Sequence, residues 1–200
     1  MRDARRDKLN KALEQRLSVV RCAVEAVYHR HNISAILRTC DALGLQHVHL
    51  VAGNDPPAPA PARGAERWLD LHFHDTPDEA FAALREAGFK VYVADLDEHG
   101  VPPEALPLDE PICLWFGAEL VGPSPRAREL ADGVMTLPMR GLAQSLNVSV
   151  AAALSLRAVS ERVRVERGDD ALLGPTERER VWEAWMERAS SSRRDLTQQD

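Results

Sequence analysis

The chain has few aromatic residues and few cysteines, and both absences narrow the class of fold. Phe, Trp and Tyr make up 5% of its 200 residues, which disfavours an all-β sandwich, while a hydrophobic content of 44% suffices for a substantial core. The three cysteines, Cys22, Cys40 and Cys113, stand far apart in apolar surroundings. An odd count without paired spacing argues against disulfides and cysteine-based zinc sites, so we interpret them as small core residues.

The sequence also lacks a long apolar run and a targeting signal. No run reaches the roughly 18 apolar residues that a membrane-spanning helix needs. The N-terminal segment MRDARRDKLNKALEQR is charged, and no apolar stretch follows it as in a secretory signal. These features predict a cytoplasmic protein with no membrane partner.

Two glycine-rich nucleotide motifs are missing. There is no G-x-G-x-x-G and no G-x-x-x-x-G-K-[ST], which disfavours a standard dinucleotide-binding fold and a phosphate-cradling NTPase. Three His-x-His pairs are present instead, and on a strand the two members of a pair would share a face. No visible spacing supplies a third or fourth ligand, so we predict no metal site. The pairs are His29/His31, His47/His49 and His72/His74.

A surplus of positive charge is absent as well. The net charge of −6 argues mildly against a nucleic-acid partner, because phosphate binding needs basic groups. The distribution of charge weakens this argument, since the first sixteen residues are rich in basic side chains, and nearly all the basic residues of the chain are Arg, the better bidentate phosphate ligand. A solvated helix face is the plainer interpretation. The basic residues in question are Arg2, Arg5, Arg6, Lys8, Lys11 and Arg16.

Apolar periodicity predicts an α/β fold in which strands and helices alternate. This order is typical of a mainly parallel sheet with helices on both faces. Residues 53–64 are rich in Pro and Ala and predict an extended loop, and the tail after residue 189 should be frayed. We predict strands at 18–24, 47–52, 69–74, 90–96, 112–117 and 134–138, and helices at 3–16, 33–44, 77–87, 127–132, 145–167 and 176–189.

Three polar or glycine-containing loops follow predicted strands, at residues 29–32, 117–122 and 139–145. In parallel sheets ligands bind beyond the carboxyl ends of the strands, so these loops are expected to converge on a ligand site. The third loop enters a very apolar helix, and either Ser145 or Asn147 can cap that helix. Arg38 lies inside an apolar run, where a charge needs a partner or a cleft, and Glu119 stands alone after a buried strand.

Three segments together resemble the SpoU (TrmH) family of RNA ribose 2′-O-methyltransferases within the SPOUT superfamily. NISAILRTCDALG (32–44) is similar to the first family motif, LWFGAELVG (114–122) to the second, and LPMRGLAQSLNVSVAAAL (137–154) to the third. Arg140 and Pro123 depart from the family pattern. The short basic N-terminal helix and the C-terminal helix further resemble the branch of the family that acts on guanosine-18 of tRNA, in the D-loop.

The resemblance implies a C-terminal deep trefoil knot, a homodimer and S-adenosylmethionine (AdoMet) as cofactor. It divides the chain into a basic helical extension (1–17), a methyltransferase domain (18–168) and a C-terminal helix with its tail (169–200). The catalytic residues it implies are Asn32, Arg38, Glu119, Ser145 and Asn147. The cofactor-binding residues are Leu114, Phe116, Gly117, Glu119, Leu137, Pro138, Met139, Gly141, Ser145 and Leu146. We add Arg5, Arg6, Lys8, Lys11, Arg30 and His31 as candidate RNA-binding residues.

The activity implied is methyl transfer from AdoMet to a ribose 2′-hydroxyl of tRNA, without a metal. Arg38 matches the catalytic arginine of the family, but a guanidinium is a poor base. We interpret it as holding the adjacent phosphate and stabilising the developing alkoxide, while the phosphate or water takes the proton. Plainer roles are helix capping for Asn32 and Asn147 and a structural ion pair for Glu119. The alternatives are a family member acting on ribosomal RNA or another tRNA position, a non-catalytic AdoMet- or RNA-binding relative, and a different nucleotide-dependent α/β enzyme.

Overall fold

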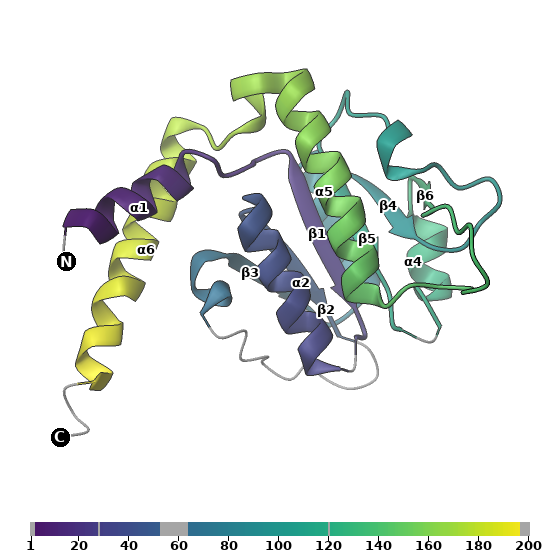
Figure 1. Ribbon diagram of the computed structural model, residues 1–200, viewed down its shortest axis with the longest axis horizontal. Coiled ribbons are helices and arrows are strands. Elements are labelled where there is room, and N and C mark those ends of the chain that lie inside the picture. The colour runs from purple at the N-terminus through teal and green to yellow at the C-terminus, as the bar shows by residue number, and fades with distance from the viewer. Residues whose placement is uncertain (1–2, 28, 53–63, 120, 197–200) are drawn as a thin grey trace.

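The computed structural model describes residues 3–27, 29–52, 64–119 and 121–196, with side chains as far as residue 190. Within these residues six strands form one parallel sheet in the order β3-β2-β1-β5-β4-β6 (Figure 1). The predicted α/β class with a mainly parallel sheet is confirmed. The strands are β1 (Val20–Glu25), β2 (His47–Val51), β3 (Asp70–His74), β4 (Lys90–Ala94), β5 (Ile112–Phe116) and β6 (Gly133–Met135).

Helices cover both faces of the sheet. Helices α2 and α5 pack together over one face and α3 and α4 over the other, while α1 packs on α6 at one end of the molecule (Figure 1). No helix of the described part is long and apolar enough to cross a membrane. The helices are α1 (Asp3–Leu13), α2 (Arg30–Leu43), α3 (Pro77–Glu86), α4 (Pro125–Leu130), α5 (Val148–Arg167) and α6 (Pro175–Leu196), with short 3-10 turns at Ala65–Trp68, Pro103–Ala105 and Gly168–Ala171.

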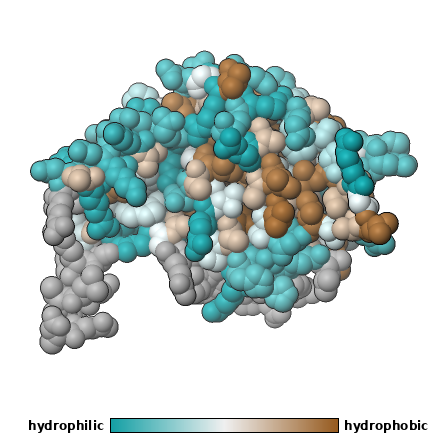
Figure 2. Space-filling view, viewed as in Figure 1, coloured by the Kyte–Doolittle hydropathy of each residue, from teal (hydrophilic) through white to brown (hydrophobic). Residues whose placement is uncertain are grey.

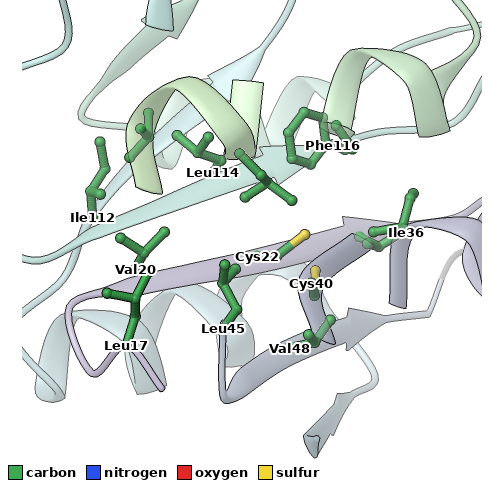
Figure 3. Close-up of a cluster of buried hydrophobic side chains, with 14 of the residues drawn as sticks. Leu17, Val20, Cys22, Ile36, Cys40, Leu45, Val48, Ile112, Leu114 and Phe116 are labelled. Carbon is green, nitrogen blue, oxygen red and sulfur yellow. The ribbon is translucent and has the colours of Figure 1, made fainter. Parts of the chain in front are cut away.

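The larger core lies between the sheet and the pair α2/α5. Strand residues alternate between the faces, so Val20, Cys22 and Val24 enter this core while Ala23 enters the core under α3 and α4. Figure 3 shows Cys22 and Cys40 among the aliphatic side chains of this cluster. All three cysteines are buried and free, which confirms their interpretation as core residues.

Helix α2 shows how the apolar spacing produces the element. Ile33, Ile36, Leu37 and Cys40 recur at helical intervals, and all four are buried. The helix ends at Gly44, which adopts φ +81° and donates its backbone N–H to the Asp41 carbonyl at 3.1 Å. The predicted glycine stop is therefore confirmed.

Several predicted boundaries are wrong: the first helix ends at Leu13 rather than at residue 16, and the last strand ends at Met135 rather than at residue 138. Residues 30–32 form the first turn of α2, because the His29 carbonyl already accepts the N–H groups of Asn32 and Ile33, so 29–32 is not a turn. Helix α5 begins at Val148 rather than at residue 145. Helix α6 continues to Leu196, through part of the tail predicted to be frayed. The predicted loop at 53–64 lies outside the described residues except for Gly64.

Candidate active site

A cavity of about 400 Å³ lies beyond the carboxyl ends of β4, β5 and β6. Three segments line it: the residues after β4, the loop 117–122 after β5, and the segment that leads from β6 into α5. The lining residues are Ala94, Asp95, Leu96, Phe116, Gly117, Ala118, Glu119, Val121, Gly122, Met135, Leu137, Met139, Gln144, Ser145, Leu146, Val148 and Ala151. This is the position at which open parallel sheets hold their ligands.

The loop after β5 depends on a close approach of two glycines. A Cβ atom on Gly117 would lie 2.1 Å from the carbonyl carbon of Gly122, so no larger residue fits at position 117. Gly122 adopts φ +69°, in the left-handed region that favours glycine. Its N–H donates to the Ala118 carbonyl at 2.8 Å and closes the loop. The two glycines thereby keep this wall of the cavity thin and backbone-lined.

A chain of side-chain hydrogen bonds joins the three predicted loops. Asn32 Nδ2 donates to Glu119 Oε1 at 2.8 Å, and Asn147 Nδ2 donates to Asn32 Oδ1 at 3.1 Å. Asn32 is 2% exposed, so these bonds satisfy a buried amide that would otherwise be costly. These bonds bring together the start of α2, the loop after β5 and the start of α5, as the sequence predicts.

Asn147 also settles which residue caps α5. Its Oδ1 accepts the backbone N–H of Ser149 at 2.8 Å and the Ser149 hydroxyl at 2.6 Å. The side chain thus combines capping with the link to Asn32, so the two interpretations of Asn147 coexist. Asn32 lies inside the first turn of α2 and is not its cap, because the N-cap position belongs to His29.

The carboxylate of Glu119 is held in its charged form. Partial burial would raise its pKa, but hydrogen bonds from the Asn32 side chain and from backbone groups of Glu119 and His29 outweigh burial and bring the pKa below its usual value. Glu119 therefore acts as a hydrogen-bond acceptor at neutral pH. Its partner is an amide rather than a cation, unlike the structural ion pair considered from the sequence.

Arg38 and Ser145 are placed differently from this network. Ser145 lines the cavity and is exposed. Arg38 is exposed on α2, outside the cavity lining, and has no hydrogen bond or ion pair with the described residues. The apolar residues around Arg38 in the sequence lie on the opposite side of the helix, which faces the core. Arg38 is thus a cation on α2 with no hydrogen-bond or ion-pair partner among the described residues, and it is open to an anionic group.

Seven of the ten predicted cofactor-binding residues line the cavity. Of the other three, Leu114 is fully buried in the core beneath it, and Pro138 and Gly141 are exposed in the neighbouring segment. Sequence reasoning missed the residues after β4, Asp95 above all. The available signal was the predicted strand at 90–96, because its carboxyl end should also face a ligand site. The seven are Phe116, Gly117, Glu119, Leu137, Met139, Ser145 and Leu146.

The cavity suits a cofactor that carries both apolar and polar groups. Aliphatic side chains and Phe116 offer surfaces to an adenine ring and a methionine chain, while Gln144 and Ser145 offer hydrogen-bond partners to hydroxyl, amino and carboxyl groups. The close glycines leave backbone groups accessible at the wall. The residues present therefore fit AdoMet.

The two histidine pairs on β2 and β3 interleave into one ladder. His47 Nδ1 lies 2.9 Å from His72 Nε2, and His49 Nδ1 lies 2.9 Å from His74 Nε2. Burial, with the neighbouring His72 and Arg21, lowers the pKa of His49 to about 2, and burial with His47 lowers that of His72 to about 4. Among the described residues no group of three or more potential ligands has the arrangement of a metal site. The ladder therefore holds His49 and His72 as neutral rings bonded to neighbouring histidines.

The candidate RNA-binding residues occupy two separate places. Arg5, Arg6, Lys8 and Lys11 are exposed on α1, while Arg30 and His31 are exposed at the start of α2, near the network. Figure 1 shows α1 and the start of α2 well apart. Arg16, counted with the basic N-terminal residues, is instead 2% exposed and is bonded to the Leu45 carbonyl and the Asp41 carboxylate.

Comparisons with known proteins show similarity to one family over most of the chain. The model of the SpoU rRNA Methylase family matches residues 20–157. The tRNA (guanosine(18)-2'-O)-methyltransferase of Thermus thermophilus is 38% identical over 187 residues, covering 92% of this chain and 96% of that protein.

Solved structures show the same similarity. The A. aeolicus TrmH/SpoU tRNA-modifying enzyme superposes with a TM-score of 0.82 at 30% identity, covering 92% of this chain and 95% of that one. The SpoU methyltransferase AviRb from Streptomyces viridochromogenes, solved with AdoMet, gives a TM-score of 0.62 at 27% identity, covering 76% of this chain and 60% of that one.

Proposed function

Because the chain belongs to the SpoU methylase family, we propose that it transfers a methyl group from AdoMet to the ribose 2′-hydroxyl of a guanosine in tRNA, at position 18 in the D-loop. The observation that carries this proposal is the Asn32–Glu119–Asn147 network beside a cavity that fits the cofactor. Similarity to tRNA methyltransferases along nearly the whole chain favours tRNA over ribosomal RNA.

The cofactor residues are assigned to the cavity wall. AdoMet supplies a methyl group on a sulfonium, so methyl transfer forms an oxygen–carbon bond while the sulfur keeps the electron pair of the broken bond. The protein must orient the ribose and assist loss of its proton. We assign AdoMet binding to the ten cofactor-binding residues predicted from the sequence. Seven of them line the cavity, and Leu114, Pro138 and Gly141 support its wall from outside the lining.

Arg38 and Ser145 are assigned to the ribose side. Arg38 is exposed, carries a bidentate donor and has no competing partner among the described residues, so it is available to an RNA phosphate. It would stabilise the developing alkoxide, and the phosphate or water would take the proton. Asn32, Glu119 and Asn147 hold the surrounding loops in place, and Ser145 faces the cavity from the α5 side.

We also propose the trefoil knot, the homodimer and the domain division implied by the family. The knot is supported by the path of the chain, since β6 lies at the sheet edge beside β4 whereas α5 packs over β1 and β5. The homodimer is supported by an exposed apolar stripe at the start of α5, formed by Leu146 just before the helix and by Val150 and Leu154 on it, which are 36%, 45% and 51% exposed. Figure 2 shows hydrophobic side chains gathered over this part of α5.

The remaining assignments concern RNA and the cell. We assign RNA contacts to Arg5, Arg6, Lys8 and Lys11 on α1 and to Arg30 and His31 beside the site, and we place the enzyme in the cytoplasm. Because α1 and the start of α2 are separated, one RNA would contact both groups only by spanning the protein or by crossing two protomers. Reversing the charges of Arg5 and Arg6 should then weaken binding and lower its salt dependence.

The first experiment is transfer of labelled methyl groups from AdoMet to unmodified tRNA, followed by nuclease digestion and nucleoside analysis. We expect 2′-O-methylguanosine from the wild-type protein and a large loss of it with Arg38→Ala at unchanged AdoMet affinity. Labelling of ribosomal RNA but not tRNA would replace the substrate. AdoMet binding without labelling of either RNA would favour a non-catalytic relative and refute the enzyme proposal.

Turnover of Arg38→Lys separates two roles for this residue. Lysine keeps the charge but loses the planar fork that contacts two phosphate oxygens. We expect a marked fall in kcat. A turnover near that of the wild type would contradict the need for the fork and leave only a requirement for charge.

A further inference from the structure

Asp95 is a carboxylate at the cavity that no step of the proposed mechanism uses. It follows the last residue of β4, borders the cavity, and keeps 21% of its side chain exposed. Its Oδ1 accepts the backbone N–H of Leu96 at 2.9 Å, and its Oδ2 lies 2.9 Å from Nε of Arg128. Each carboxylate oxygen therefore has one donor, and the two donors come from different parts of the chain.

Arg128 connects this carboxylate to the loop after β5. It lies on α4, and its Nη2 is 3.5 Å from the Val121 carbonyl. A Cβ atom placed on Gly122 would lie 3.4 Å from Nη2 of Arg128 and 3.5 Å from Oδ1 of Asp95. Both members of the ion pair thus lie next to Gly122, which is part of the cavity wall.

We propose that Asp95 and Arg128 form a latch that holds the described residues of the loop after β5, 117–119 and 121–122, in their cofactor-binding conformation. The proposal rests on the proposed function, since the cavity must be the AdoMet site for the latch to matter in this way. Both residues act as positioning residues. They link the end of β4, helix α4 and the loop, three elements that are separate in the sequence.

The latch complements tethers on the other sides of the same loop. Glu119 is bonded to Asn32 on the α2 side. At the exit of the loop, the buried Glu25 carboxylate accepts the backbone N–H of Ser124 at 3.1 Å. The latch adds a tether on the β4 side. A wall that is ordered before the cofactor arrives needs less ordering on binding, which improves affinity.

The expected effect is modest because the pair is partly exposed. Arg128 is 45% exposed, and ion pairs of this kind contribute little and are screened by salt. We expect Arg128→Gln and Asp95→Asn each to raise the Kd for AdoMet by about two- to fivefold. The double variant should show no larger rise than either single variant, because each removes the same contact.

The experiment measures AdoMet binding by calorimetry and, on the free protein, hydrogen exchange of the Gly122 amide. This amide is bonded to the Ala118 carbonyl inside the loop, so its exchange reports loop opening without any cofactor. The matched control is Arg126→Gln. Arg126 lies on the same helix and pairs with Asp78 and Glu129, none of which borders the cavity.

Faster exchange and a higher Kd in both latch variants, with neither in Arg126→Gln, would support the proposal. A rise in the KM for AdoMet that exceeds any fall in kcat, and that shrinks at high salt, would agree with it. Faster exchange with an unchanged Kd would overturn the role in cofactor binding. A wild-type protein that binds no AdoMet would refute the proposed function instead, and the exchange of Gly122 would still decide whether the latch holds the loop.

Discussion

Acid should destabilise this protein through His49, whose ring lies in the histidine ladder between β2 and β3. The side chain is 1% exposed, and burial together with His72 and Arg21 lowers its pKa to about 2. An unfolded histidine titrates near a pKa of about 6.5. Below that pH the unfolded chain binds a proton that the folded chain does not, so the free energy of unfolding must fall as the pH falls.

The size of the effect follows from the two pKa values. Between pH 7 and pH 5 the contribution of His49 is about 2 kcal/mol. This result is insensitive to the folded value, because any folded pKa below about 4 leaves His49 neutral at pH 5 and gives nearly the same loss. His72, with a pKa of about 4, acts in the same direction and adds a loss of similar size over this pH range.

The test compares urea unfolding of the wild type and His49→Asn at pH 7, 6 and 5, at one protein concentration. Asn removes the titration while keeping a polar atom near Nδ1, which faces His74. The variant should be less stable at pH 7, yet its loss between pH 7 and pH 5 should be smaller than that of the wild type by about 2 kcal/mol. His99→Asn, at a side chain 87% exposed, is the control and should leave the pH dependence unchanged.

Equal losses in the wild type and His49→Asn would refute the reasoning. They would mean that the ladder accepts protons without opening, or that other groups dominate the acid response. A wild-type stability that rises between pH 7 and pH 5 would contradict the sign itself.

Two further predictions concern the walls of the cavity. Gly117→Ala should abolish AdoMet binding and lower the free energy of unfolding by about 1–3 kcal/mol, because the added Cβ would meet the Gly122 backbone. Calorimetry and urea unfolding measure these two effects. The control, Gly174→Ala, has open space for its Cβ and should be nearly neutral. Asn32→Asp should lower the free energy of unfolding by about 1–3 kcal/mol at pH 8, because it removes the donor to Glu119 and adds a like charge. Urea unfolding should show partial recovery as the pH falls and the carboxylates protonate, and a loss independent of pH would contradict the charge argument.

The sequence determined the class of fold and much of the site because both follow from local patterns. Alternating strands and helices predict a parallel sheet, and the apolar spacing of α2 predicts its buried face and its end at Gly44. Asn32, Glu119 and Asn147 were selected because they match the three family motifs, and each also stands in a loop after a strand or at a helix start. A local pattern of this kind predicts that such loops meet, and the hydrogen bonds among these three residues confirm it.

Tertiary structure decided what depends on contacts between distant residues. The strand order places β4 between β5 and β6, which brings Asp95 to the cavity and within reach of Arg128, and no local pattern encodes that order. The choice of Asn147 over Ser145 as cap follows from the start of α5 at Val148, where Asn147 accepts the Ser149 N–H. Arg38 lies outside the cavity lining, because the elements next to α2 determine which face of this helix packs against the core. Local propensity acts over a few residues, whereas these placements depend on packing across the whole sheet.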